Sequence, residues 1–384
     1  MSDSMDFGLS FTTAIEEGID FAKLRGHLRL GLDRLLGHRK FNPESHIWMS
    51  GSGDSLFAAQ AVLPGLQRWA GLKGTAISGM EFSRYRVPLL EENDSLWAIS
   101  NSGSAARTRE TVALAKSRGA LAVGITGSES GALAAVADTY IYRPVEDLPS
   151  INEVSRGIFM NMNEFLVTMY SLYYVGLHIG IAKKSTSQSK VDEILCDCEI
   201  AIKSVGKMAE NLEPSAKALA AQLVGIENVW IIGAGPSHGT ARYCAAKFHE
   251  QLPLNGIPED LEEWAHLQYF LTLSWKSRSV VVVLAPAGNS LDRAEELVHG
   301  IHDVGGRAIV VCDKTHGDFP EATSEFRLSA DSEFLSPFTY HIPVQLLILH
   351  LARQNGCEPY ALRRHDTYKL IRHGVVLEDS MKLS

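Results

Sequence analysis

The feature that most constrains this chain is a long internal repeat of a strand that runs into a glycine turn. Residues Ile47–Gly53 and Val229–Gly235 share this pattern, and Gly51 corresponds to Gly233 at an offset of 182 residues. Further matches keep the same order while the offset grows: Ser95–Gly103 with Val280–Gly288 at 185, and Gly119 with Gly306 at 187. A slowly growing offset with preserved order predicts two related domains that differ by small loop insertions.

Each copy alternates short apolar strands with helical segments. Strands that are apolar nearly throughout suit a parallel sheet, which is buried on both faces. Their alternation with helices predicts βαβ crossovers and therefore a doubly wound fold. We expect an α/β protein of two tandem domains, each a parallel sheet flanked by helices. The predicted boundaries are N-terminal helices over 1–45, a first domain over 46–184, a linker helix over 185–218, a second domain over 219–357 and a tail over 358–384.

Composition excludes several classes of function. A net charge of −9 argues against a nucleic-acid binder, which needs clustered cations to neutralise phosphates. No run of about 18 uncharged apolar residues is found, and we interpret Phe165–Ile181 as a buried helix, so no membrane partner is expected. We expect no signal peptide, and the five dispersed cysteines favour a reducing cytoplasm. No metal site and no cofactor are expected.

Two hydroxyl-rich turns follow strands of the first copy, at Ser50–Ser55 and Ser100–Ser104. Ligands of open parallel sheets bind at the carboxyl ends of strands, where a glycine turn that opens a helix offers N–H donors. One such turn alone fits an ordinary helix N-cap better than an anion site. Two turns in equivalent places favour an anion site. The second copy has lost these hydroxyls, so we predict one phosphate site per chain, on the first copy.

These turns, with Ile99–Ser104 leading into a helix and Gly124–Thr126 beyond it, resemble the sugar isomerase (SIS) domain family. The tandem form is similar to the isomerase half of glucosamine-6-phosphate synthases and to fructosamine-6-phosphate deglycases. The resemblance implies that the first copy binds a sugar phosphate, and the residues that it assigns to the phosphate are Ser52, Ser100, Asn101 and Ser102. The family often has a hydroxyl residue at the position of Ala105, so one phosphate ligand is missing here.

The resemblance also implies a catalytic Glu and a His sixteen residues later, which are matched by Glu250 and His266. Glu263 matches a further motif glutamate, and its offset of 182 from Glu81 supports the same register. The Gly-Pro that follows the family's His is replaced by Leu267 and Gln268. At the position of the family's tail lysine, this chain has Arg372 or His373.

The chemistry of an aldose–ketose isomerisation explains these residue types. One carboxylate, here Glu250, can remove a proton from one carbon and return it to the next. Ring opening needs a group that moves a proton near neutral pH, which suits His266. Helix N-termini, Lys247 or the tail cations Arg372 and His373 would stabilise the developing oxyanion. In the family the His can come from the partner subunit, which implies a homodimer with a shared site.

The sequence leaves three functions open. The first is a deglycase or isomerising deaminase that acts on a 6-phosphorylated amino sugar or sugar amine. The second is a simple phosphosugar isomerase that releases no amine. The third is a non-catalytic sugar-phosphate-binding regulator. Glutamine hydrolysis is not expected of this chain, because its first cysteine is Cys196.

Overall fold

The computed structural model describes residues 6–252, 254–329, 332–358, 361, 365–372 and 376. The chain divides into two compact units. The first unit comprises Glu17–Asp147, Met160–Glu199 and Arg363–Ser384, and the second comprises Met1–Glu16, Leu148–Phe159 and Ile200–Leu362. Each unit is built around one sheet.

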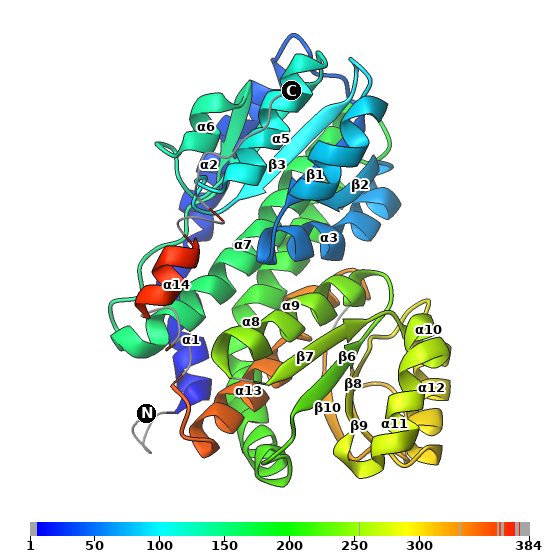
Figure 1. Ribbon diagram of the computed structural model, residues 1–384. Coiled ribbons are helices and arrows are strands. Elements are labelled where there is room, and N and C mark those ends of the chain that lie inside the picture. The colour runs from blue at the N-terminus through cyan, green and yellow to red at the C-terminus, as the bar shows by residue number, and fades with distance from the viewer. Residues whose placement is uncertain are drawn as a thin grey trace. The chain divides into compact units, whose positions relative to one another are not determined.

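The first unit contains a five-stranded sheet in the order β2-β1-β3-β4-β5, and every neighbouring pair is parallel (Figure 1). Its strands are β1 (His46–Gly51), β2 (Lys73–Ser78), β3 (Ser95–Ser100), β4 (Leu121–Thr126) and β5 (Thr139–Tyr142). The residues of β3 and β4 are all buried, as expected for central strands covered on both faces.

The second unit contains a five-stranded parallel sheet in the order β10-β9-β8-β6-β7. Its strands are β6 (Asn228–Ile232), β7 (Asn255–Glu259), β8 (Val280–Ala285), β9 (Arg307–Asp313) and β10 (Ser324–Leu328). When corresponding strands are matched in sequence order, this is the same topology as the first sheet. The predicted α/β fold of two doubly wound parallel sheets is therefore confirmed.

Helices cover the sheets. In the first unit they are α2 (Phe21–Leu36), α3 (Asp54–Ala70), α4 (Gly79–Glu81), α5 (Ala106–Ser117) and α6 (Ala132–Val136), and the short α14 (Asp366–Ile371) buries none of its residues. In the second unit they are α9 (Pro236–Gln251), α10 (Leu261–Glu263), α11 (Tyr269–Trp275), α12 (Leu291–Asp303) and α13 (Ile342–Gln354). Three helices contribute residues to both units: α1 (Phe7–Gly18), α7 (Glu153–Ala182) and α8 (Gln188–Gln222).

Side-chain alternation along the strands builds a core on each face of a sheet. In β3, Leu96 and Ala98 pack with Val112 and Ala115 of α5, whereas Trp97 belongs to the opposite face. In the second unit, Val281 and Val283 of β8 pack in the same way with residues of α12. Crossover helices thus cover the sheets as βαβ connections require.

An irregular turn gives independent evidence for the repeat. A π-helical turn follows α4 at Phe82–Arg86, and another follows α10 at Trp264–Gln268, again 182 residues later. π-Turns are rare, so their recurrence at equivalent positions supports common descent of the copies. One predicted match is wrong by a residue: Gly119, at φ 85°, corresponds to Gly305, at φ 84°, and not to Gly306. Both glycines occupy the left-handed region after a helix, which the sequence pattern alone does not mark.

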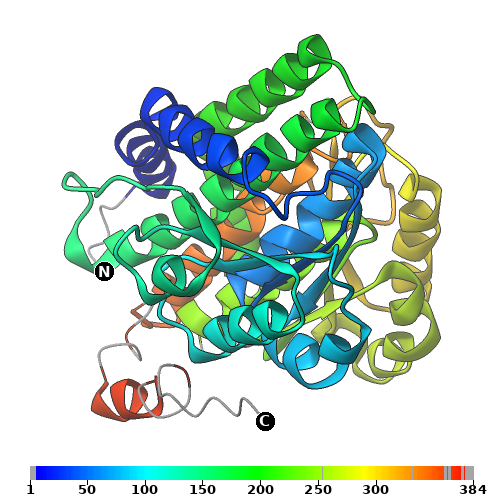
Figure 2. The ribbon, with the colours of Figure 1, turned by 90° about the horizontal axis from the view of Figure 1, so that it is seen from above.

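One helix among the described residues is long and apolar enough to cross a membrane, the segment 155–182 of α7. In its most apolar stretch 83% of the residues are buried within the protein. It is drawn in green with α8 in Figure 2. The interpretation of Phe165–Ile181 as a core helix agrees with this burial.

Candidate functional site

The turn after β3 gathers the hydroxyl groups that were predicted to bind phosphate. Ser100 ends the strand and is buried, while Ser102 is exposed. The Oγ atoms of Ser102 and Ser104 lie 2.7 Å apart, and the N–H of Ser104 donates to Ser102 Oγ at 3.3 Å. Gly103 adopts a φ of 65°, which lets the chain reverse before α5 begins. The turn therefore presents hydroxyls and a helix N-terminus on one loop.

The turn after β1 lies beside it, because β1 and β3 are neighbours in the sheet. Ser52 and Gly53 are exposed there, and Gly53 has a φ of 56°. Ser50 is fully buried, and its Oγ has no hydrogen-bond partner among the residues that the structure describes. Ser52, Ser100, Asn101 and Ser102 thus lie on two adjacent loops at the carboxyl edge of the first sheet.

Ala105 is the N-cap residue of α5, and no side chain caps the helix there. The sequence predicted a missing hydroxyl ligand at this position. An uncapped N-terminus leaves N–H groups that need an acceptor. An anion can supply such an acceptor.

The side chain of Asn101 is held by a buried arginine that the sequence analysis did not single out. Arg143 follows β5, is fully buried, and donates from Nη1 to Asn101 Oδ1 at 3.2 Å. The N–H of Gly127 donates to the backbone oxygen of Asn101 at 2.9 Å. A lone basic residue directly after an apolar strand was the available sequence signal for Arg143.

The equivalent turn of the second copy is occupied by a carboxylate of the same unit. Asn289, which corresponds to Ser104, donates its N–H to Glu333 Oε2 at 3.0 Å, and its side-chain amide donates to Oε1. A Cβ atom at Gly288 would collide with the same carboxylate. The donors of this turn are therefore already engaged, which supports the prediction of a single phosphate site per chain.

Glu250 lies in the last turn of α9, beside a buried lysine. Lys247 Nζ lies 2.9 Å from Glu250 Oε2, and the Lys247 side chain is 1% exposed whereas that of Glu250 is 30% exposed. The ammonium group also lies 4.8 Å from the centroid of the Tyr243 ring. The ion pair fixes the carboxylate at the edge of solvent, as a group that transfers protons requires.

A buried polar network supports this pair from α13. His341 contacts Tyr243 ring to ring at 5.6 Å, and burial lowers the pKa of His341 to about 3. Gln345 donates to the Tyr243 hydroxyl at 3.2 Å. Neutral His341 and the Tyr243 ring thus form the wall next to Lys247. The sequence analysis did not identify either residue, because both have the apolar neighbours typical of a core helix.

Glu263 and His266 follow β7, and both are exposed. His266 lies in the π-helical turn, its side chain is 69% exposed, and its Nε2 lies 3.2 Å from Glu262 Oε1. Glu262 in turn pairs with Arg293 at 2.8 Å. The predicted histidine is therefore held on the protein surface by its neighbour in the helix.

The structure does not bring Glu250 and His266 together within one unit. Glu250 precedes β7, at the edge where His249 Nε2 lies 3.2 Å from Asn255 Oδ1. His266 lies beyond the other end of β7. Five strand residues of about 3.3 Å each separate the two edges by roughly 15 Å. The two side chains are therefore placed at opposite ends of β7.

The predictions for the two tail residues, Arg372 and His373, have different outcomes. Arg372 is exposed, and its Nη1 donates to the Tyr368 hydroxyl at 3.1 Å. His373 lies outside the described residues. A role of either residue in substrate binding stays a prediction.

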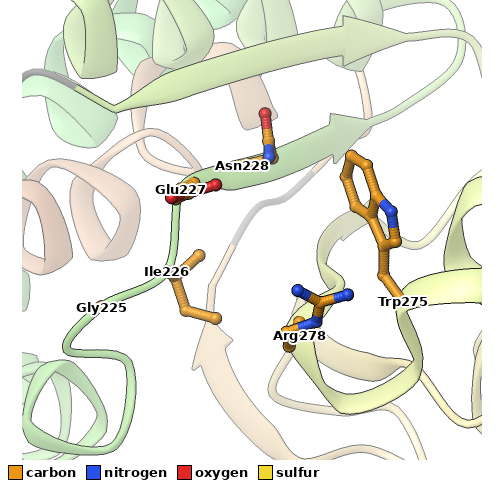
Figure 3. Close-up of a pocket in the computed structure, with 6 residues that line it drawn as sticks. All are labelled: Gly225, Ile226, Glu227, Asn228, Trp275 and Arg278. Carbon is orange, nitrogen blue, oxygen red and sulfur yellow. The ribbon is translucent and has the colours of Figure 1, made fainter.

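A cleft in the second unit involves none of the predicted residues. It is lined by Gly225, Ile226, Glu227, Asn228, Trp275 and Arg278, and Figure 3 shows Trp275 and Arg278 facing the start of β6. This is the amino edge of the sheet. None of the predicted site residues lines this cleft, so we do not assign the substrate to it.

Comparison with known proteins identifies the first copy. Residues 40–174 match the family described as SIS domain. The second copy repeats its topology, so the chain has the tandem SIS fold that the sequence predicted.

Curated relatives share the SIS region at low identity. A glutamine–fructose-6-phosphate aminotransferase (isomerizing) of Streptomyces coelicolor is 24% identical over 298 residues, which are 76% of this chain and 46% of that protein. A protein of the same name from Zymomonas mobilis is 24% identical over 313 residues, which are 80% of this chain and 49% of that protein. The chain thus spans about half the length of the curated relatives that it matches.

Solved structures share the fold over nearly the whole chain. The C-terminal domain of glucosamine-fructose-6-phosphate aminotransferase from Francisella tularensis has a TM-score of 0.74 at 20% identity, over 91% of this chain and 94% of that one. Glucosamine-6-phosphate deaminase from Thermotoga maritima has a TM-score of 0.65 at 17% identity, over 92% and 96%. At such identities the likeness establishes the tandem fold and no particular activity.

Proposed function

We propose that this chain is a phosphosugar enzyme of the isomerase type that acts on a 6-phosphorylated amino sugar or sugar amine, as a deglycase or an isomerising deaminase. The observation that carries the proposal is the hydroxyl-rich turn at Ser100–Ser104 of the first unit, and the second unit separately offers a fixed, half-buried carboxylate at Glu250. The first is suited to an anion and the second to proton transfer. Relatives named as isomerising aminotransferases and a deaminase of the same fold support the substrate class.

The phosphate would be bound by Ser52, Ser100, Asn101 and Ser102. Neutral hydroxyl, amide and backbone donors bind a phosphate without adding a competing charge. The N-terminus of α5, where Ala105 provides no side-chain cap, adds the positive end of the helix dipole. The occupied turn at Asn289 makes a second phosphate site in the other copy unfavourable.

Proton transfer between neighbouring carbons would be carried out by Glu250, with Lys247 holding its carboxylate. Lys247 is too buried to approach a substrate freely, so we assign it to the support of Glu250 rather than to substrate contact. The oxyanion of an enediolamine would be stabilised by helix N-termini or by the tail cations Arg372 and His373.

Ring opening would use His266 of a second subunit. Its exposure and its distance from Glu250 along β7 favour a histidine that acts on a neighbouring subunit's substrate. The proposal therefore includes a homodimer with a shared site, and Glu263 would lie beside that histidine at the interface. The five cysteines are free thiols, which suits a cytoplasmic enzyme.

The proposal is tested by turnover of glucosamine 6-phosphate and of fructosamine 6-phosphates, with ammonia or amine release assayed alongside isomerisation. Wild type should release the amine, and Glu250→Gln should lose at least about 100-fold in kcat. Isomerisation without amine release would assign the chain to simple phosphosugar isomerases. Tight phosphosugar binding without any turnover would assign it to non-catalytic regulators.

A further inference from the structure

Arg143 is a buried cation with an incomplete set of acceptors. Its side chain is fully buried after β5, and Nη1 donates to Asn101 Oδ1 at 3.2 Å. The Nε and Nη2 atoms have no hydrogen-bond partner among the described residues. Burial lowers the pKa of Arg143 to about 10, and the charge of Glu164 acts in the opposite direction. A guanidinium in this position is still charged at neutral pH.

Such an arrangement is unfavourable in the absence of ligand. A buried charge is tolerated when it is paired and when its donors are satisfied. Of the three guanidinium nitrogen atoms of Arg143, Nη1 alone donates to an acceptor among the described residues. That acceptor is the neutral side-chain amide of Asn101. An anion close to Asn101 would supply acceptors for Nε and Nη2.

The contact with Arg143 also decides which way the Asn101 amide faces. Arginine has donors only, so the oxygen of Asn101 must point toward it and the NH₂ group away from it. The close approach of the Asn101 side chain to Gly127, where a Cβ would collide with Oδ1, limits the alternatives. Asn101 is thereby set with its two amide donors available beyond the arginine.

We propose that Arg143 is a positioning residue of the phosphate site, which orients Asn101 as a donor and provides the buried counter-charge for the bound phosphate. This inference rests on the proposed function only in taking the carboxyl edge of β1 and β3 as the phosphate site. It adds a charge to a set of ligands that is otherwise neutral. It also accounts for a site that binds a dianion although Ala105 replaces one hydroxyl.

The test compares Arg143→Met, Arg143→Lys and Arg34→Met by calorimetric titration with inorganic phosphate and with glucosamine 6-phosphate. Arg34 is the matched control, because it is an exposed arginine next to the same strand. It donates to the carbonyl of Tyr140 in β5, the strand that precedes Arg143, and not to Asn101. Arg143→Met should weaken phosphate binding by about 10- to 100-fold, as expected for a charge-assisted contact. Arg143→Lys should recover part of the loss, and Arg34→Met should bind as wild type does.

Thermal unfolding without ligand separates positioning from a structural role. Because an apolar side chain replaces a buried charge whose hydrogen bonds are incomplete, unliganded Arg143→Met should melt at the wild-type temperature or above. Asn101→Asp supplies the missing anion, so it should raise the melting temperature while weakening phosphate binding.

Three results would contradict the account, and they are distinguishable. Phosphate binding by Arg143→Met at wild-type affinity overturns the inference and leaves the phosphate site intact. Failure of Arg143→Met to fold also overturns it, since the charge is then compensated in the unliganded protein. Absence of phosphate binding by wild type overturns the site itself, and the proposed function with it.

Discussion

Lys247 Nζ lies 2.9 Å from Glu250 Oε2 on α9, in an i,i+3 pair whose lysine is buried and whose carboxylate reaches solvent. A pair with the same spacing, Lys207 and Glu210 on α8, lies 3.0 Å apart but has its lysine 74% exposed. Exposed pairs of this kind contribute little to stability. The burial of Lys247 distinguishes the Lys247–Glu250 pair from the exposed pair. A buried lysine can hold the Glu250 carboxylate in one position for proton transfer.

Replacing Lys247 by methionine should lower kcat by about tenfold or more with a smaller change in KM, because the carboxylate loses its fixed position. Lys207→Met is the matched control and should leave both constants unchanged. Steady-state kinetics with circular dichroism as a check of folding measure this effect. Equal kcat values in the two variants would contradict the assigned role of Lys247.

Replacing Ser100 or Ser102 by alanine should raise KM by about tenfold each with little change in kcat, since hydrogen bonds to a charged group contribute about 1.5–3 kcal/mol. Ser117, whose Oγ donates to the Leu114 carbonyl at the far end of α5, provides the control. Binding of the phosphorylated sugar, measured by titration, should weaken in parallel. An unchanged KM in both variants would remove the turn from the phosphate site.

Glu333→Ala should free the donors of the turn at Asn289 and allow a second anion to bind. Calorimetric titration with inorganic phosphate should then give a stoichiometry of two per chain in place of one, with the second site the weaker. Asp318→Ala is a suitable control, because this exposed carboxylate of the same unit pairs with Arg327 and not with the turn. A stoichiometry that stays at one would show that the turn lacks the geometry for phosphate.

The stability of the second unit should fall as pH decreases below neutrality. The pKa of His341 is lowered to about 3 by burial, against about 6.5 when unfolded. Between these values the unfolded chain binds the extra proton, so the free energy of unfolding decreases as pH falls. This group alone should remove about 2 kcal/mol between pH 7 and pH 5. Urea unfolding of wild type and His341→Gln at both pH values checks it, and equal pH dependence in the two proteins would exclude His341 as the cause.

The sequence was sufficient to predict the doubled fold, because apolar strands and glycine turns depend on local patterns that repeat. It also located the hydroxyl turn of Ser100–Ser104 from the strand that precedes it. It did not indicate Arg143 or Glu333, since their partners, Asn101 and Asn289, are 42 and 44 residues away in the chain. The error of one residue at Gly305 has a similar origin, because two adjacent glycines offer no local signal for which of them takes the left-handed conformation. Contacts over such separations depend on the sheet topology and not on the local pattern.

Exchange of solvent deuterium into the substrate tests the central claim most directly. In ²H₂O, wild type should incorporate deuterium at the carbon next to the anomeric centre of a 6-phosphorylated amino sugar, because Glu250 removes that proton and exchanges it. Glu250→Gln, with folding and phosphate binding retained, should show no incorporation on the same timescale in proton NMR spectra. Incorporation by Glu250→Gln at the wild-type rate would contradict the account.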